Sequence, residues 1–413
     1  MEKIKLDNNK QDQLNLVIKI KIEIAENIYY VGIHDWNLRN FHGYSTHRGS
    51  TYNSYLILDD KIALIDQVKG PFTDQFIKNI EEIIDSKKID YFICNHLEGD
   101  HSQSLVRLSE LVPNAQIVTS ERGKAGFLRM YKKNWDIKPV KEGDTINLGK
   151  RTLTFVPVPM VHWPDSMVTY CTPDNILFSN DAFGQHIARS KIFDDENDLN
   201  KVMDEAKKYY ANIVMHLSSI IARVLKKVTE DLKLDIKMIC PSHGVIWRSH
   251  VNKILEKYVY WANRETEEKI LIIYDTMWHS TEKMAMAIAE GIRQEGVEVK
   301  IYNLTLTDNS DIIKDVLDSR GLAIGTPTIN NGMFPTVGGF LTYLKGLRPP
   351  AKVAGTFGSF GWSPKGGAEA ALEELKEARI PELIEPIKFQ FTPSEDELKQ
   401  CIEWGRNLAR KVK

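Results

Sequence analysis

The segment CNHLEGDHSQS, residues 94 to 104, carries four side chains of the kinds that bind metal ions. His96 and Glu98 end the apolar run IDYFICN, and residues two apart on a strand project from one face. Gly99 frees the backbone to turn, so that Asp100 and His101 can point back at the same place. This segment alone therefore offers enough ligands to begin two metal sites.

Three further candidate ligands follow apolar runs later in the chain. His162 comes after LTFVPVP, Asp181 directly after NILFSN, and His243 directly after IKMICPS. Loops at strand ends are where open α/β sheets build their functional sites. A lone histidine is usually a core or surface residue, but these candidates share one structural context and together indicate a binuclear metal centre.

The charge of this set bears on which metal it suits. Two ferrous ions carry four positive charges, which Glu98, Asp100, Asp181 and one bridging hydroxide would balance. A histidine at position 98 would leave one positive charge over. Low net charge and hard oxygen donors favour higher oxidation states, so the glutamate suits iron that cycles between ferrous and ferric. A zinc hydrolase would gain little from a glutamate at position 98, because its metal needs positive charge to acidify bound water.

Composition and charge restrict the class of protein. The chain has 413 residues, 42% of them hydrophobic and 27% charged, which is typical of a folded protein with two domains. A net charge of −2 with interleaved signs favours neither a nucleic acid nor a membrane surface as partner. The longest apolar runs fall short of the ~20 residues that span a bilayer, and the N-terminus is polar, so a cytoplasmic location is expected.

The spacing of the cysteines excludes several kinds of metal and redox site. Cys94, Cys171, Cys240 and Cys401 are far apart, with no Cys-x-x-Cys pair. This pattern argues against a zinc ribbon, a rubredoxin-type iron site or a thioredoxin-like motif, and predicts four buried thiols.

Two patterns of secondary structure divide the chain. In the first half, LVIKIKIEI, NSYLILDD and KIALIDQV predict a β meander, after which short strands alternate with helices. After the charged run YWANRETEEKI, four apolar strands alternate strictly with helices, which predicts a doubly wound parallel sheet. We therefore expect domains at 1–265 and 266–413.

Three loops of the second half follow successive strands and can hold a phosphate and a flat heterocycle. DTMWHSTEKMA leads into a helix whose N-terminus suits a phosphate, and it is neither a Walker loop nor a dinucleotide fingerprint. Small residues and aromatic side chains in the other two loops can approach a ring. The loops resemble those of short-chain flavodoxins, which implies FMN. The candidate FMN-binding residues are Thr276, Met277, Trp278, His279, Ser280, Thr281, Thr326, Pro327, Thr328, Ile329, Asn330, Asn331, Ser359, Phe360, Gly361 and Trp362.

The chain as a whole resembles the flavodiiron proteins. The resemblance is carried by DWNLRNFHGYSTHRGSTYNSYLI, HWPDSM, NDAFGQHIA, CPSHGVIWR, YDTMWHSTEKMA and GTPTINN, and by the glutamate that replaces the second histidine of the metallo-β-lactamase ligand turn. It implies an α/β fold: a metallo-β-lactamase-like αββα sandwich followed by a flavodoxin-like doubly wound parallel sheet. It also implies that His96, Glu98 and His162 bind one iron ion and Asp100, His101 and His243 the other, with Asp181 and an oxo or hydroxo group as bridges.

The same resemblance implies an activity and partners. Flavodiiron proteins reduce O2 to water, NO to N2O, or both, with electrons relayed through FMN, and they protect anaerobes. His34 and Tyr209 or Tyr210 resemble residues that donate protons or hydrogen bonds near the iron pair, although plain packing there carries equal weight. A head-to-tail homodimer, or a dimer of such dimers, is implied. With no Cys-x-x-Cys module in the chain, the electron donor is expected to be separate, such as rubredoxin or reduced coenzyme F420.

Two alternatives belong to other classes. One is a di-zinc hydrolase, for instance of thioesters, to which a flavodoxin-like domain adds regulation. The other is an electron carrier whose first domain is vestigial. Glu98 argues against the first alternative and the complete ligand set against the second.

Overall fold

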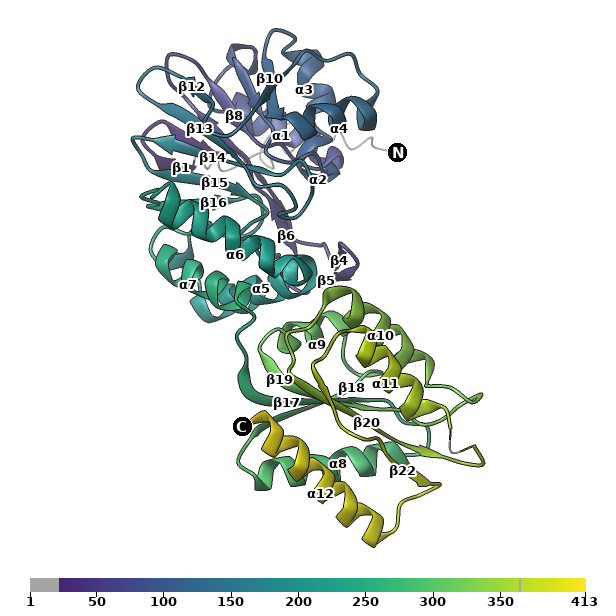
Figure 1. Ribbon diagram of the computed structural model, residues 1–413. Coiled ribbons are helices and arrows are strands. Elements are labelled where there is room, and N and C mark those ends of the chain that lie inside the picture. The colour runs from purple at the N-terminus through teal and green to yellow at the C-terminus, as the bar shows by residue number, and fades with distance from the viewer. Residues whose placement is uncertain (1–21, 364) are drawn as a thin grey trace, which may run out of the picture.

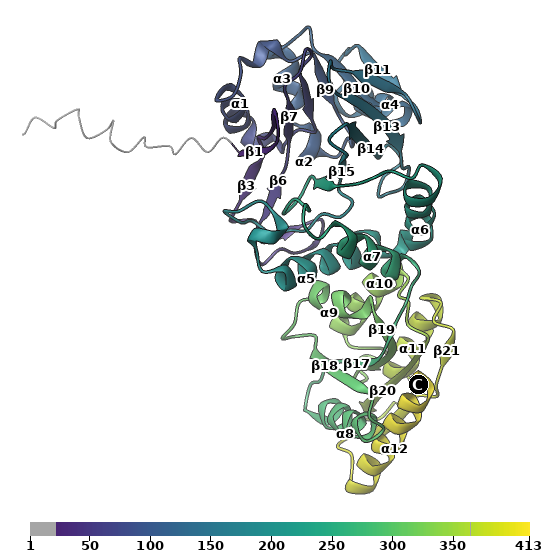
Figure 2. The ribbon, with the colours of Figure 1, turned by 90° about the vertical axis from the view of Figure 1, so that its left-hand side faces the viewer.

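The computed structural model describes residues 22–363 and 365–413. It forms an elongated molecule with two lobes stacked end to end, as Figure 1 shows. The upper lobe contains the elements up to α7, and the lower lobe contains those from β17 onward (Figure 2). The first part of the expected strand LVIKIKIEI lies outside the described residues, which include its end as β1.

Two sheets face each other in the upper lobe. The first has the order β1-β2-β7-β8-β9-β10-β11, and β7 and β8 form the antiparallel hairpin of the predicted meander. Its strands are β1 (Ile22–Ala25), β2 (Ile28–Tyr30), β7 (Tyr55–Ile57), β8 (Ala63–Ile65), β9 (Tyr91–Ile93), β10 (Gln116–Ser120) and β11 (Ile137–Val140). The second has the order β12 (Thr145–Asn147), β13 (Thr152–Pro157), β14 (Met167–Thr172), β15 (Ile176–Asn180) and β16 (Met238–Pro241).

Helices cover the outer faces of both sheets (Figure 1). One apolar cluster fills the space between the sheets, with Phe155 and Phe178 facing Tyr55 and Ile65. The first sheet is covered by α1 (Thr73–Glu81), α3 (Leu105–Leu111) and α4 (Glu121–Tyr131), and the second by α5 (Leu199–Tyr209), α6 (Ser218–Lys226) and α7 (Val251–Ala262). The αββα sandwich expected from the sequence is therefore confirmed.

Short elements project from the sandwich towards the lower lobe. They are the strand pairs β3 (Ile33–Asp35) with β6 (Ser50–Tyr52) and β4 (Asn40–Phe41) with β5 (Tyr44–Ser45). Irregular turns complete the lobe: η3 (Gly70–Phe72), η4 (Ser86–Lys88), η5 (Asp194–Glu196), η6 (Tyr210–Val214), η7 (Met215–Leu217) and η8 (Lys227–Asp231). The segments η6 and η8 are π-helical.

The lower lobe is the predicted doubly wound sheet. Its order is β18 (Glu298–Asn303), β17 (Glu267–Tyr274), β19 (Ser319–Gly325), β20 (Val353–Phe360) and β21 (Glu382–Leu383), and β22 (Ile387–Gln390) also pairs with β20. All these pairings are parallel, and the last six residues of β17 are buried, as expected for a strand covered on both faces.

Helices pack on each face of this sheet. One face carries α9 (Asn309–Val316), α10 (Pro335–Leu347) and α11 (Gly367–Glu377), and the other carries α8 (Ser280–Gln294) and α12 (Glu395–Val412). Glycines let α8 and α12 approach closely: a Cβ on Gly291 would lie 1.9 Å from the carbonyl oxygen of Ile402. No helix among the described residues is long and apolar enough to cross a membrane.

The two lobes share a core and a polar contact. A single apolar cluster contains buried residues of α5, α6 and α7 together with residues of β17, β19, α9 and α10. Beside it, the Lys208 ammonium donates to Ser45 Oγ at 2.9 Å and to Asp311 at 2.6 Å, and Tyr343 donates to Asn212 at 2.6 Å. Buried contact of this kind holds the lobes in one arrangement.

Candidate metal centre and flavin site

The turn that carries four candidate ligands runs from β9 into the short helix α2 (Gly99–Ser102). Asp66 holds it in place: its two carboxylate oxygens accept from the backbone and side-chain N–H groups of Asn95 at 2.8 and 3.0 Å. The same carboxylate accepts from Asn180 at 3.2 Å, directly before Asp181. Asp66 thereby keeps the two ligand-bearing segments side by side.

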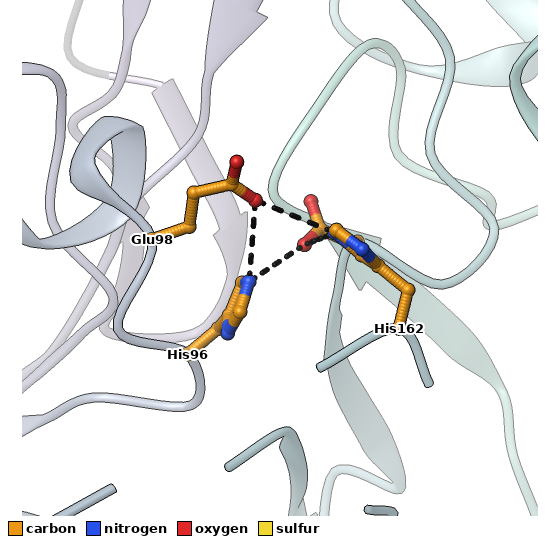
Figure 3. Close-up of side chains that lie close together, drawn as sticks. His96, Glu98 and His162 are labelled. Atoms are coloured by element: carbon orange, nitrogen blue, oxygen red, sulfur yellow. Dashed lines mark hydrogen bonds and ion pairs between the residues drawn. The ribbon is translucent and has the colours of Figure 1, made fainter. Parts of the chain in front are cut away.

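All seven candidate ligands meet at one place. His96, Glu98, His162 and Asp181 form one group, and Asp100, His101 and His243 form another, with ligand atoms within 4.8 Å of one another in each. Figure 3 shows Glu98 facing His96 and His162, which come from different loops. Every member is buried except Glu98 and His162, which are partly buried.

The Asp181 carboxylate lies between the two groups. One oxygen is 3.1 Å from His101 Nε2 and 3.4 Å from His243 Nε2. The other is 3.3 Å from His162 Nε2 and 3.7 Å from His96 Nε2. A carboxylate with one oxygen towards each group is arranged as a bridge between two metal ions.

Hydrogen bonds behind the histidines fix which nitrogen faces the centre. His96 Nδ1 lies 3.0 Å from the Asp165 carboxylate, and His243 Nδ1 lies 2.6 Å from the carbonyl oxygen of Thr51. Both partners are acceptors, so each Nδ1 carries a proton and Nε2 is the nitrogen left to bind a metal. This support is typical of metal-binding histidines.

The polar atoms of the centre suit cations. Both oxygens of Asp100, one oxygen of Asp181, and Nε2 of His162 and His243 are buried and have no hydrogen-bond partner among the described residues. Buried polar atoms without partners are rare and costly, so their concentration here fits a metal pair. The mixed nitrogen and oxygen donors suit iron.

Electrostatics of the metal-free cluster agree with this fit. Burial would lower the pKa of His243, but Asp100 and Asp181 raise it to about 10. Burial likewise opposes protonation of His162, yet Asp181 and Glu98 raise its pKa to about 9. Burial would raise the pKa of Glu98, but the surrounding histidines hold it well below its usual range. The carboxylates thus attract positive charge, whether protons or metal ions.

Two histidines that the sequence analysis did not single out also lie at the centre. His42 Nε2 is 3.1 Å from Glu98, and His42 joins Glu98 and Asp100 in a third potential metal-binding group. The His186 ring packs 4.7 Å from that of His243, and its Nδ1 is 2.7 Å from Ser50 Oγ. The only sequence signal for them was their place in two runs that carry the family resemblance, DWNLRNFHGYSTHRGSTYNSYLI for His42 and NDAFGQHIA for His186.

The three residues expected around the metals lie in different surroundings. The Tyr209 ring lies 5.1 Å from that of His186 and 6.2 Å from that of His243, and its hydroxyl has no partner among the described residues. Tyr210 points elsewhere and bonds to Ser218 at 3.0 Å. His34 lies against Tyr30 and stacks on Trp36. Of the three, Tyr209 lies beside the candidate ligand His243.

The predicted flavin loops meet around a cavity of about 650 Å3 in the lower lobe. Its size and mixed apolar and polar lining are those of a cofactor site. Twelve of the sixteen predicted residues line it: Met277, Trp278, Ser280, Pro327, Thr328, Ile329, Asn330, Asn331, Ser359, Phe360, Gly361 and Trp362. The Trp278 and Trp362 side chains are 81% and 92% exposed, so a planar ring could bind beside them.

The other four predicted residues do not line the cavity. Thr276 has a buried hydroxyl without a partner among the described residues, as a phosphate-binding group would before its ligand arrives. His279 turns away to Glu282 at 2.6 Å, Thr281 lies 3.3 Å from Ser359, and Thr326 accepts from the Phe334 N–H. Ser363, Phe391 and Thr392 line the cavity and were not foreseen.

Comparison with known proteins agrees with both sites. The family model for ODP family beta lactamase matches residues 51–244, and the flavodoxin model matches residues 272–405. A nitric oxide reductase of Moorella thermoacetica is 46% identical over 396 residues, covering 95% of this chain and 98% of that protein. This chain belongs to the flavodiiron protein family. An anaerobic nitric oxide reductase flavorubredoxin of Vibrio vulnificus is 40% identical, over 94% of this chain and 79% of that protein.

Solved structures of flavodiiron proteins also resemble this chain over nearly its whole length. The rubredoxin oxygen:oxidoreductase of Desulfovibrio gigas superposes with a TM-score of 0.92 at 38% identity, covering 95% of this chain and 98% of that chain. The flavodiiron protein of Giardia intestinalis gives a TM-score of 0.90 at 35% identity, covering 95% and 96%. The protein is therefore an oxidoreductase whose cofactors are FMN and a pair of iron ions, and the di-zinc hydrolase alternative is set aside.

Proposed function

We propose that this flavodiiron protein reduces NO to N2O, and O2 to water, at a diiron centre supplied with electrons by FMN. We assign His96, Glu98 and His162 to one iron ion, Asp100, His101 and His243 to the other, and Asp181 to the bridge. Relatives named as nitric oxide reductases and as an oxygen oxidoreductase support both substrates.

The observation that carries this proposal is the division of the Asp181 oxygens between two ligand groups, one of which contains Glu98. Two positions close enough to share a carboxylate allow both metals to act on one small substrate. Three carboxylates also bring the reduced pair close to neutrality, which favours iron that changes oxidation state.

When bound, the iron pair would supply reducing electrons and open coordination positions, and FMN would supply single electrons. The protein contributes orientation and a dry environment: His96, His101 and His243 have no exposed surface. Asp165 and Thr51 hold two of the imidazoles in the required tautomer. Reduction of two NO needs two electrons and two protons and yields N2O and water, and we propose that Tyr209 takes part in proton supply.

We further propose that the flavin of one subunit serves the metal centre of another in a head-to-tail dimer. The flavin cavity lies among loops of the lower lobe, whereas α2 and the metal centre belong to the upper lobe (Figures 1 and 2). Large exposed apolar side chains border the cavity, including Phe391 at 63%. Exposed apolar patches of this kind are typical of interfaces.

The electron donor is proposed to be a separate protein or hydride carrier, either rubredoxin or reduced coenzyme F420. The D. gigas relative is named for its use of rubredoxin. We propose that the protein works in the cytoplasm of an anaerobe, where it removes NO and O2. Reduction of the bound FMN by each donor in turn, followed by flavin absorbance, distinguishes the two.

The test of the function is an anaerobic preparation in which iron, zinc and FMN are quantified per chain. The dithionite-reduced protein is then mixed with NO or with O2 in a stopped-flow instrument, and N2O is measured by gas chromatography. We expect two iron ions and one FMN per chain, rapid flavin oxidation, and one N2O for every two NO. Zinc without iron, together with a flavin that stays reduced in both gases, would refute the proposal.

A further inference from the structure

A second, much smaller cavity lies against the metal centre. It is lined by Val161, His162, Asp181, Ala182, Tyr209, Val214, Ile221 and Tyr258, and we name it the gas cavity. These residues come from the loops after β13 and β15, from the end of α5, from the π-helical η6, and from α6 and α7. The cavity therefore lies between the second sheet and the helices that cover it.

The gas cavity is distinct from the space that the two metal ions would fill. Of the seven candidate ligands, only His162 and Asp181 line it, whereas His96, Glu98, Asp100, His101 and His243 do not. It therefore adjoins the centre on the side of His162 and Asp181, each of which has a buried polar atom without a hydrogen-bond partner among the described residues.

Its lining is mostly apolar. Val214 and Ile221 are 5% and 3% exposed, and Val161 and Ala182 pack against the same core cluster. The hydroxyl oxygen of Tyr258 accepts the Phe183 backbone N–H at 2.7 Å. Only Tyr209 offers a hydroxyl without a partner among the described residues. A water molecule needs two to four polar partners. Once His162 and Asp181 hold metal ions, only the two tyrosine hydroxyls remain as polar groups on this lining, which favours an apolar molecule over water.

Its size selects a very small occupant. About 10 Å3 is open to the centre of a water-sized sphere, which is room for about one such sphere. NO and O2 are apolar diatomic molecules close to this size, and apolar molecules leave water readily for such a site. FMN and any organic substrate are excluded by volume.

We propose that the gas cavity binds one apolar diatomic molecule, NO or O2, next to the Asp181 and His162 side of the metal pair, as a waiting site from which substrate reaches the iron. This inference rests on the proposed function and adds to it a place and a route for the gas. For NO reduction, which consumes two molecules, such a site would keep the second molecule at hand.

Xenon tests the cavity without turnover. Crystals of the iron- and FMN-loaded protein are pressurised with xenon, and the anomalous signal is located. We expect a xenon atom among Val161, Val214 and Ile221 in the wild type, greater occupancy in Val214→Ala, and none in Val214→Phe, in which the ring fills the space. A wild-type crystal with no xenon there overturns the proposal.

Kinetics test the route. Val214→Phe is compared with Val224→Phe, which enlarges a valine of α6 that does not line the cavity. With equal iron and FMN content, we expect the second-order rate constant for NO to fall about tenfold in Val214→Phe only. The reason is that a filled cavity would slow the association of NO with the iron pair. Equal rates in the two variants overturn the proposal. A wild-type protein that holds iron yet consumes neither gas instead overturns the proposed function, and the xenon result remains readable beside it.

Discussion

Asp165 lies directly behind His96, and one of its carboxylate oxygens accepts from His96 Nδ1 at 3.0 Å and from the Leu97 backbone N–H at 2.8 Å. Asp165 is 2% exposed and belongs to none of the candidate metal-binding groups found among the described residues. Its effect on the centre therefore passes through His96, whose ring it orients and whose Nε2 it makes more basic.

Asp165→Asn is expected to weaken iron binding by about 10- to 100-fold, because the charge behind His96 is lost. Anaerobic ferrous titration of metal-free protein, followed by Mössbauer spectroscopy, measures the affinity and shows which of the two sites is affected. Asp174→Asn is the control, since Asp174 pairs with Arg151 away from the centre. Iron affinity equal to that of the wild type in Asp165→Asn would show that the contact is only structural.

Glu98→His restores the ligand turn of the hydrolases and leaves one more positive charge on the centre. We expect the reduction potentials of the iron pair to rise and the preparation to contain more zinc, because ferric iron loses an oxygen donor. Redox titration followed by electron paramagnetic resonance measures the potentials. Glu98→Gln separates charge from ligand type: it should raise the potentials too, and unchanged potentials in both variants would contradict the charge argument.

The convergence of the seven candidate ligands could be predicted because it depends on local order. Each of the seven residues lies in the turn or short helix that follows a strand, and the segments after β9, β13, β15 and β16 meet at the centre. The partition of Asp181 oxygens agrees with the assignment that the family resemblance implies.

Residues whose position depends on distant packing could not be predicted. His42 contacts Glu98 from the turn of the small β4–β5 hairpin, where it adopts a left-handed φ of 51°. No periodicity of the sequence predicts that turn. Tyr209 and Tyr210 are adjacent in sequence, and only the change from α5 to the π-helical η6 decides which faces the metals. Phe391 reaches the flavin cavity after β22, beyond any recognisable loop motif.

The metal-free centre should bind iron more tightly as pH rises. His162 and His243 have folded pKa values of about 9 and 10, above the value near 6.5 of a free imidazole. Their protons stabilise the metal-free fold fully below about pH 6.5, and this stability is lost as pH rises through 9 to 10. Iron must displace these protons, so its affinity should rise between pH 6.5 and 9 by up to about tenfold per pH unit for each proton released.

Calorimetric ferrous titrations in two buffers of different ionisation enthalpy count the protons released. We expect net release at pH 7 and a smaller number at pH 9. An affinity that is flat across this range would mean that the imidazoles are already neutral, and would contradict the pKa values on which the prediction rests.

Complementation between two inactive variants tests the head-to-tail dimer. Asp181→Ala should lose the iron pair and keep FMN. Ser280→Glu should do the reverse, because a carboxylate at the first position of α8 suits the helix yet repels the phosphate of FMN. Each homodimer should be inactive.

Co-expression of the two chains gives mixed dimers that unite the flavin of one with the metals of the other. We expect about a quarter of the wild-type NO consumption, since half of random pairs are mixed and each mixed dimer holds one complete relay. Ser280→Ala, which adds no charge, is the control and should keep its FMN. If transfer runs within one chain instead, the mixture stays as inactive as its parents, and sedimentation of the same samples shows whether mixed dimers were present to be judged.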